Sequence, residues 1–160
     1  MSGLEWLEAL SYIVTIIGLP LAIGVYVYDR RREQQTDEEE IFLRLSDEYA
    51  DFMRLVIENA DLHLLSPTAK GALSEDQQER KQALFAILVA LFERAYVLVY
   101  EDDMSRQQAR LWLSWEDYMH EWCAREDFRA ALPPLLTGED SGFVATIERI
   151  AASAAHPEAV

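Results

Sequence analysis

The stretch YIVTIIGLPLAIGVYVY, residues 12–28, decides how the chain is organised, and it contains no charged residue. The segment from Trp6 to Tyr28 is 23 residues long. At 1.5 Å per residue, a helix of that length spans about 34 Å, and the hydrocarbon core of a bilayer is about 30 Å thick. The stretch therefore predicts a retained transmembrane helix.

A buried core helix and a cleaved signal peptide are the two alternatives. Core helices of soluble domains rarely run this long without a polar face. A signal peptide has a basic segment in front and small residues at its cleavage site. Here Glu5 and Glu8 lie in front, and the bulky Tyr26 and Tyr28 lie at the end. Both alternatives fit less well than a retained span.

The residues that flank the span predict its orientation. The only basic cluster near it lies on its C-terminal side, and short basic segments stay in the cytoplasm. We therefore expect a single-pass protein of the inner (cytoplasmic) membrane, with the N-terminus outside and the C-terminal domain in the cytoplasm. The residues expected to contact lipid headgroups are Arg30, Arg31 and Arg32.

One face of the predicted span carries small and hydroxyl-bearing residues. Helices in membranes associate through close backbone approach at such residues, because lipid is as apolar as Leu. The face predicts packing against another helix, either a second copy or a partner; the alternative is that small residues are simply common in spans. Its members are Ser11, Thr15, Gly18 and Ala22.

The charge of the chain is concentrated after the span. The 160 residues carry a formal net charge of -15, and residues 1–32 hold three acidic residues and three arginines. The whole acidic excess thus falls on residues 33–160, which argues against nucleic acid as a partner. Cys123 is the only cysteine, so an internal disulfide is impossible, in agreement with a reducing compartment.

Four segments follow from this reading, and together they predict an all-α protein. They are a membrane anchor with a basic collar (1–32), an acidic linker (33–40), a cytoplasmic helical bundle (41–153) and a flexible tail (154–160). In the bundle, no long stretch alternates with a period of two, and apolar residues recur at helical spacing, as in the stripe Ile41, Leu45, Tyr49, Phe52 and Val56. The expected helices cover about 37–59, 74–100, 105–125 and 141–153, with one more turn at 127–132 before Pro133 and Pro134. Ser74 with Gln77 and Ser105 with Gln108 are predicted capping boxes at the start of the second and third of these helices.

The helix at 74–100 is apolar on nearly every side between Ala83 and Tyr100. A second span is one explanation, but Glu93 and Arg94 would each cost about 2.5–3.5 kcal/mol to insert. A helix of this kind also suits the centre of a bundle, and we prefer that interpretation. Glu93 and Arg94 are then expected to reach the surface or pair with neighbours such as Arg110 or Asp117, the alternative being a buried functional ion pair.

The segment WEDYMHEWC, residues 115–123, is the densest cluster of chemically capable side chains. Glu116, His120 and Cys123 are metal-ligand types at helical spacing, but one helix alone lacks the ligands of a metal site. The aromatic residues of this helix offer a candidate partner surface, although aromatics at this spacing are more often core. That surface would consist of Trp112, Trp115, Tyr118 and Trp122.

Several segments together resemble a family of small bacterial membrane-anchored proteins of unknown function. The resemblance implies an N-terminal span and a cytoplasmic helical domain, and it implies no active site. The segments are TIIGLPLAI (15–23), LSDEYADFMRL (45–55), ENADLHLL (58–65), LFERAYVLVY (91–100) and WEDYMHEWC (115–123).

The function expected from the sequence is that of a membrane-anchored interaction module, such as a subunit, scaffold or sensor. No nucleophile elbow or phosphate-binding glycine loop is present, so we expect no catalysis, no cofactor, no metal and no small-molecule substrate. Membrane lipid and a protein partner or second copy are the expected partners. Two alternatives stay open: a pore-type membrane effector in a toxin or phage-defence system, and a metal-dependent helical-bundle enzyme.

Overall fold

The computed structural model describes residues 22–26, 28, 40–66 and 71–155. The chain divides into two units, residues 1–40 and 41–160. In the first unit, residues 22–26 are helical, and Ile23, Val25 and Tyr26 are exposed. Most of the predicted span lies outside the described residues, as do Ser11, Thr15, Gly18 and the three arginines of the collar. Ala22 is helical and exposed.

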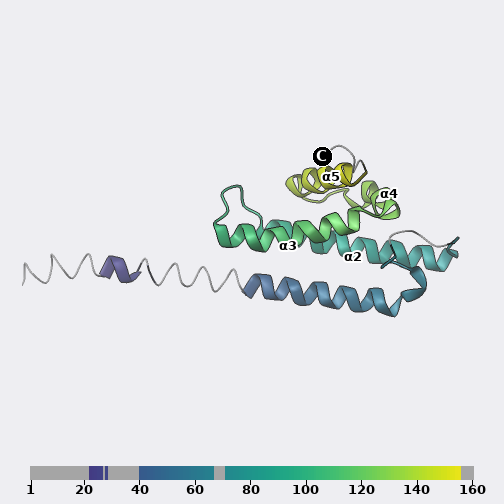
Figure 1. Ribbon diagram of the computed structural model, residues 1–160, viewed down its shortest axis with the longest axis horizontal. Coiled ribbons are helices and arrows are strands. Elements are labelled where there is room, and N and C mark those ends of the chain that lie inside the picture. Colours follow the sequence, from purple (N-terminus) through teal and green to yellow (C-terminus); the bar gives the residue numbers. More distant parts are fainter. Residues whose placement is uncertain (1–21, 27, 29–39, 67–70, 156–160) are drawn as a thin grey trace, which may run out of the picture. The chain divides into compact units, whose positions relative to one another are not determined.

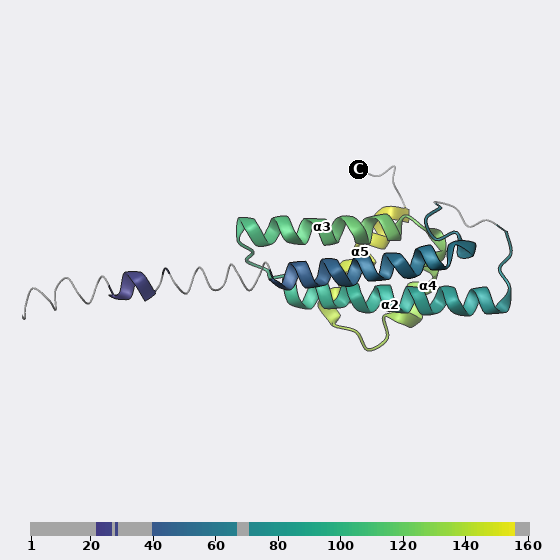
Figure 2. The same ribbon diagram turned by 90° about the horizontal axis from the view of Figure 1, so that it is seen from below.

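The second unit is built from helices, and no strand occurs in the ranges described above. Residues 40–58 form a long helix, which is followed by the 3-10 turn η1 (Ala60–Leu62). Helix 40–58 covers one side of a central pair of helices, and two further helices cover the other side (Figure 1, Figure 2). The central pair is α2 (Glu75–Val99) and α3 (Arg106–Cys123); the other two are α4 (Glu126–Leu135) and α5 (Ser141–Ala155). The prediction that the chain folds as an all-α protein is confirmed for the described residues.

Capping boxes start both central helices at the predicted residues. The backbone N–H of Gln77 donates to Ser74 Oγ at 3.2 Å, and the Ser74 N–H donates to Gln77 Oε1 at 3.0 Å. Ser105 and Gln108 form the same reciprocal pair at 3.2 and 2.9 Å. Each box satisfies two backbone groups that the first turn of a helix otherwise leaves unpaired.

The hydrophobic core is formed by side chains of α2 and of the helices that pack against it. Phe85, Leu88, Phe92 and Ala95 are fully buried along one side of α2. The apolar stripe predicted for helix 40–58 faces the same core, since Leu45, Phe52 and Val56 are at most 2% exposed. Burying several large apolar side chains at about 1.5–3 kcal/mol each provides the main stabilisation of such a bundle.

The length and apolar character of α2 would allow it to cross a membrane, and among the described helices it alone passes that test. Within its most apolar part 44% of the residues are buried in the protein. These buried side chains agree with the interpretation of α2 as the central bundle helix. Glu93 and Arg94 reach neighbours as expected, but with different partners: Arg94 pairs with Glu48, and Glu93 Oε1 accepts the Asp140 N–H at 2.6 Å.

One predicted boundary is wrong. A single turn at 127–132 was expected to stop before the two prolines, whereas α4 has 10 residues and contains Pro133 and Pro134 in its last turn. Each proline lacks a backbone N–H and so loses one helical hydrogen bond. The helical hydrogen-bond pattern continues after them, because the Leu136 N–H donates to Leu132 O at 2.9 Å. Leu132 and Leu136 are buried, so packing holds this turn despite the prolines. α5 also ends at Ala155, two residues later than expected.

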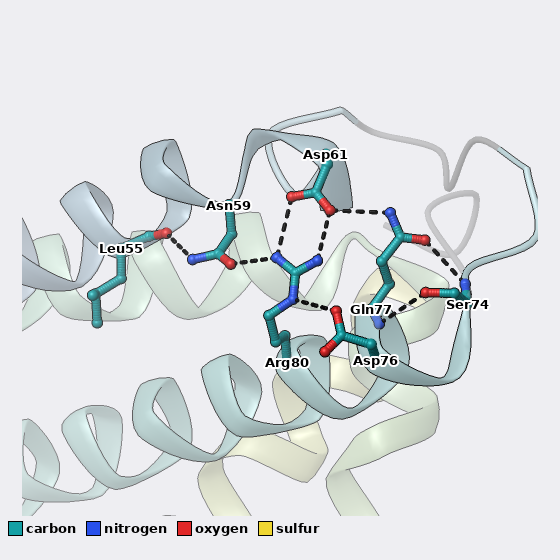
Figure 3. A network of polar contacts seen from close by, with 7 residues as sticks. All are labelled: Leu55, Asn59, Asp61, Ser74, Asp76, Gln77 and Arg80. Carbon is teal, nitrogen blue, oxygen red and sulfur yellow. Dashed lines mark hydrogen bonds and ion pairs between the residues drawn. The ribbon is translucent and has the colours of Figure 1, made fainter.

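A polar network ties the end of helix 40–58 to the start of α2 (Figure 3). The Arg80 guanidinium donates to Asn59 Oδ1 at 2.6 Å, to Asp61 Oδ2 at 2.8 Å and to Asp76 Oδ2 at 3.1 Å. Gln77 Nε2 adds a bond to Asp61 at 3.0 Å. The hydrogen bond from Arg80 lowers the pKa of Asp61 to about 2. The network fixes the connection that leads into η1.

Candidate functional site

A hollow of about 420 Å³ opens between helix 40–58, the segment after η1 and the C-terminal end of α3. Its volume lies in the range of about 300–1,000 Å³ that ligand pockets occupy. We call it the Tyr49 pocket. It is lined by Tyr49, Met53, Leu64, Leu65, Ser66, Tyr118, Glu121, Trp122, Ala124 and Arg125.

Stacked aromatic rings form one wall of the Tyr49 pocket. The rings of Tyr49 and Tyr118 stack with centroids 4.3 Å apart and planes at 16°. Behind them, Trp115 meets both rings edge to face, at 6.0 Å from Tyr49 and 5.7 Å from Tyr118. Such pairs add roughly 0.5–1.5 kcal/mol beyond the area they bury. The wall is therefore formed before any ligand arrives.

The Tyr49 hydroxyl is a partly buried polar group in this aromatic wall. It accepts a hydrogen bond from Trp122 Nε1 at 3.1 Å. Burial raises the pKa of Tyr49, and the charge of Glu121 raises it further, against the opposing effect of the Trp122 bond. The hydroxyl therefore stays protonated at neutral pH and keeps its own O–H to donate.

Arg125 holds the opposite wall in place and is only 5% exposed. Its Nη1 donates to Leu64 O at 3.0 Å and also bonds Ser66 O. Its other nitrogens bond Asp127 at 2.9 and 3.0 Å. Burial on its own would raise the pKa of Asp127, but the bonds and charges of Arg125 and Lys81 outweigh it, and the pKa lies below its usual value.

These contacts decide what Arg125 can do in the pocket. Its donors point to backbone carbonyls and to Asp127, so the guanidinium organises the wall and offers little to an anionic ligand. Among the described residues that line the pocket, Glu121 carries the second charged group, and its side chain is exposed on α3. The pocket is thus an apolar and aromatic hollow with the Tyr49 hydroxyl in its wall and a carboxylate beside it.

The structure corrects the prediction of a tryptophan-rich partner surface. Trp112, Trp115 and Trp122 are 4%, 1% and 4% exposed, so they are core residues and cannot form an open surface. Their spacing points them at α2 and helix 40–58, where burial of an indole is most favourable. Tyr118 is half-buried, and it lines the Tyr49 pocket together with an edge of Trp122.

The three metal-ligand types of the same helix are not brought together. Glu116 Oε1 accepts from Arg149 Nη2 at 3.1 Å, and His120 is exposed. Cys123 is fully buried, and this burial raises its pKa to about 12. Within the described ranges, no group of three or more His, Cys, Asp and Glu residues is placed to hold a metal ion.

Sequence reasoning missed most of the pocket. Tyr49 was assigned to the apolar stripe, and Leu64, Leu65 and Arg125 received no role. One signal was present, because Tyr49 carries a hydroxyl in a stripe of Ile, Leu, Phe and Val, and a half-buried hydroxyl needs a partner. The contact of Arg125 with Leu64 spans 61 positions and leaves no local pattern.

Comparison with models of known protein families, with curated proteins and with solved structures finds no match for this chain.

Proposed function

We propose that this protein is a membrane-anchored helical interaction module without catalytic activity, which binds a partner protein through the Tyr49 pocket. The predicted span at residues 6–28 would hold the bundle at the cytoplasmic face of the inner membrane. The observation that carries the proposal is the pocket itself, an apolar hollow of about 420 Å³ with a preformed aromatic wall. The resemblance to small bacterial membrane-anchored proteins supports the same placement.

The chemistry around the pocket favours binding over catalysis. The buried thiol of Cys123 is a poor nucleophile, because its raised pKa keeps it protonated. Arg125 is engaged with carbonyls and Asp127, and Tyr49 remains protonated. What is left for a ligand is apolar contact, the hydroxyl groups of the lining, including that of Tyr49, and attraction to the Glu121 carboxylate. A partner segment with an apolar or aromatic anchor beside a Lys or Arg would match these features.

Membrane attachment is tested by washing membranes with alkaline carbonate. The protein should stay in the pellet, and proteolysis of inverted vesicles should digest the bundle while right-side-out vesicles protect it. Release of the protein by carbonate would contradict the anchor. Digestion in right-side-out vesicles would contradict the orientation.

Partner binding is tested with two matched surface substitutions. Leu65 lines the pocket and is 64% exposed, while Leu113 on α3 lies outside it and is 54% exposed. In affinity purification from native membranes, Leu65→Glu should lose a partner that the wild type and Leu113→Glu both retain. The pocket proposal fails if Leu65→Glu retains every partner that Leu113→Glu retains.

A further inference from the structure

The outer face of helix 40–58 carries exposed apolar side chains that belong neither to the buried core nor to the lining of the Tyr49 pocket. Leu43 is 64% exposed and Ile57 is 63% exposed, and Ala50 lies exposed midway between them. These three residues are seven apart, so they lie along one line of the helix. Within the described residues, no helix lies against helix 40–58 on its side away from α2 and α3 (Figure 1).

The same face has the spacing of a coiled-coil seam. With Ser46 and Met53, which are half-buried at its edge, the apolar and small positions follow one another at intervals of three, four, three and four. This pattern differs from the core stripe, whose buried residues Leu45, Phe52 and Val56 lie roughly 110° away around the helix at 100° per residue. The seam presents a contact surface for a second helix. Its members are Leu43, Ser46, Ala50, Met53 and Ile57.

Two exposed charges flank the seam on one side, and their arrangement indicates the partner. Asp47 precedes Ala50 by three residues and Arg54 follows it by four, so the two lie nearly symmetrically about Ala50. Arg54 is 70% exposed and pairs within its own helix with Asp51, which is 67% exposed. Such an exposed pair contributes little and leaves Arg54 able to meet another carboxylate.

We propose that a second copy of this chain packs against helix 40–58 in the antiparallel direction, with Ala50 near the two-fold axis. Leu43 of each copy then faces Ile57 of the other. Asp47 of each copy then lies one residue, or about 1.5 Å along the helix axis, from the level of Arg54 of the other copy. A symmetric contact uses the same patch on both copies, and this patch is complementary to itself.

The charges favour the antiparallel over the parallel arrangement of the same helices. In a parallel pair, Asp47 and Arg54 would face the other flank of the partner's seam, which carries Tyr49 and Val56, so the opposite charges would not meet. Flanking charges of this kind set the orientation of paired helices. The small side chains of Ser46 and Ala50 in the middle allow close approach of the two backbones. This contact shares Met53 with the lining of the Tyr49 pocket, but it does not depend on the proposed function.

Cysteine cross-linking of the full chain in native membranes tests the proposal. Two differently tagged copies are co-expressed, one carrying Leu43→Cys and the other Ile57→Cys, and the native Cys123 stays because it is buried. Mild oxidation should give the mixed-tag disulfide dimer, and neither variant alone should cross-link. Leu113→Cys, at a similarly exposed site on α3, is the control and should stay monomeric.

Two results would overturn the proposal. Self-cross-linking of Leu43→Cys alone would indicate a parallel pair, as an association through the membrane span would produce. A mixed-tag yield no higher than that of the Leu113→Cys control would show that this face is not a contact between copies.

Charge reversal supplies the second measurement. Asp47→Arg should lower the dimer fraction, because both Arg54 contacts become repulsive; we expect a fall of about two- to tenfold. Asp47→Arg combined with Arg54→Asp restores opposite charges and should restore the dimer. All these positions are exposed, so the bundle itself should keep its melting temperature. Failure of the double reversal to recover cross-linking would contradict the antiparallel pairing of Asp47 with Arg54.

Discussion

Replacing Arg125 with Met should test whether the wall of the Tyr49 pocket depends on one buried guanidinium. Met approximates the unbranched aliphatic part of the Arg side chain and carries no charge, so the change removes the donors and keeps the apolar contacts of that part. It leaves the carbonyls of Leu64 and Ser66 without this donor. It also leaves the Asp127 carboxylate with Lys81, whose Nζ lies 3.3 Å away, as its remaining cationic partner.

The expected decrease in the free energy of unfolding follows from these lost contacts. Removing one partner of a buried ion pair costs about 3–5 kcal/mol. Asp127 is 20% exposed and retains Lys81, so we expect the lower end, about 3 kcal/mol. Small domains are stable by about 5–15 kcal/mol, so the variant should remain folded. Urea denaturation of the full chain in detergent, followed by tryptophan fluorescence, measures the difference.

The double variant Arg125→Met with Asp127→Leu separates charge from packing. If the uncompensated carboxylate causes most of the loss, the double variant should be more stable than Arg125→Met alone by about 1–2 kcal/mol. A loss below about 1 kcal/mol for Arg125→Met would refute the reasoning. So would additive losses in the double variant, because additivity means that the two residues do not interact.

Acid titration gives the same pair a second readout. The pKa of Asp127 in the folded protein lies below its usual value. The stability from this carboxylate is therefore fully present above the unfolded pKa of about 3.9 and is lost as pH falls below it. In Arg125→Met the folded pKa should rise towards the unfolded value. The acid-induced loss of stability should then become smaller than in the wild type.

Three further predictions concern other parts of the bundle. Ser74→Ala and Ser105→Ala should each lower the free energy of unfolding by about 0.5–2 kcal/mol, measured in urea, because each removes a helix cap; unchanged midpoints would contradict the caps. The Asp61 carboxylate should titrate near pH 2 by carbon NMR, and Arg80→Ala should move this midpoint upward; the same midpoint in both proteins would contradict their bond. Cys123 should react with a thiol reagent only after unfolding, because its pKa is about 12 in the folded chain; rapid labelling of the native protein would contradict its burial.

The sequence predicted those elements whose cause is local. Ser74 with Gln77 and Ser105 with Gln108 mark the helix starts, because a capping box needs only four consecutive residues. The buried side of helix 40–58 was also predictable, because apolar spacing depends on the helix alone.

The remaining features depend on residues that are distant in sequence. The spacing of the tryptophans of α3 favoured a core position over a partner surface, but only their neighbours decide between the two. Arg125 was not predictable as an organising residue, because its acceptors include carbonyls at Leu64 and Ser66. The length of α4 depends on whether packing at Leu132 and Leu136 outweighs two prolines, and that balance lies in tertiary contacts.

The apolar character of α2 has a consequence for biosynthesis. Residues 75–99 leave the ribosome before α3, α4 and α5, and until those helices follow, the side chains that they cover stay open. Phe85, Leu88 and Phe92 then belong to a nascent segment that is apolar enough to enter a bilayer. If the predicted anchor holds synthesis at the membrane, folding and insertion compete for α2 during this interval. A chain terminated before α5 would lack the buried Phe143, Ile147 and Ile150. Its α2 would stay partly uncovered, and the chain would become a substrate for membrane insertion or for proteolytic quality control.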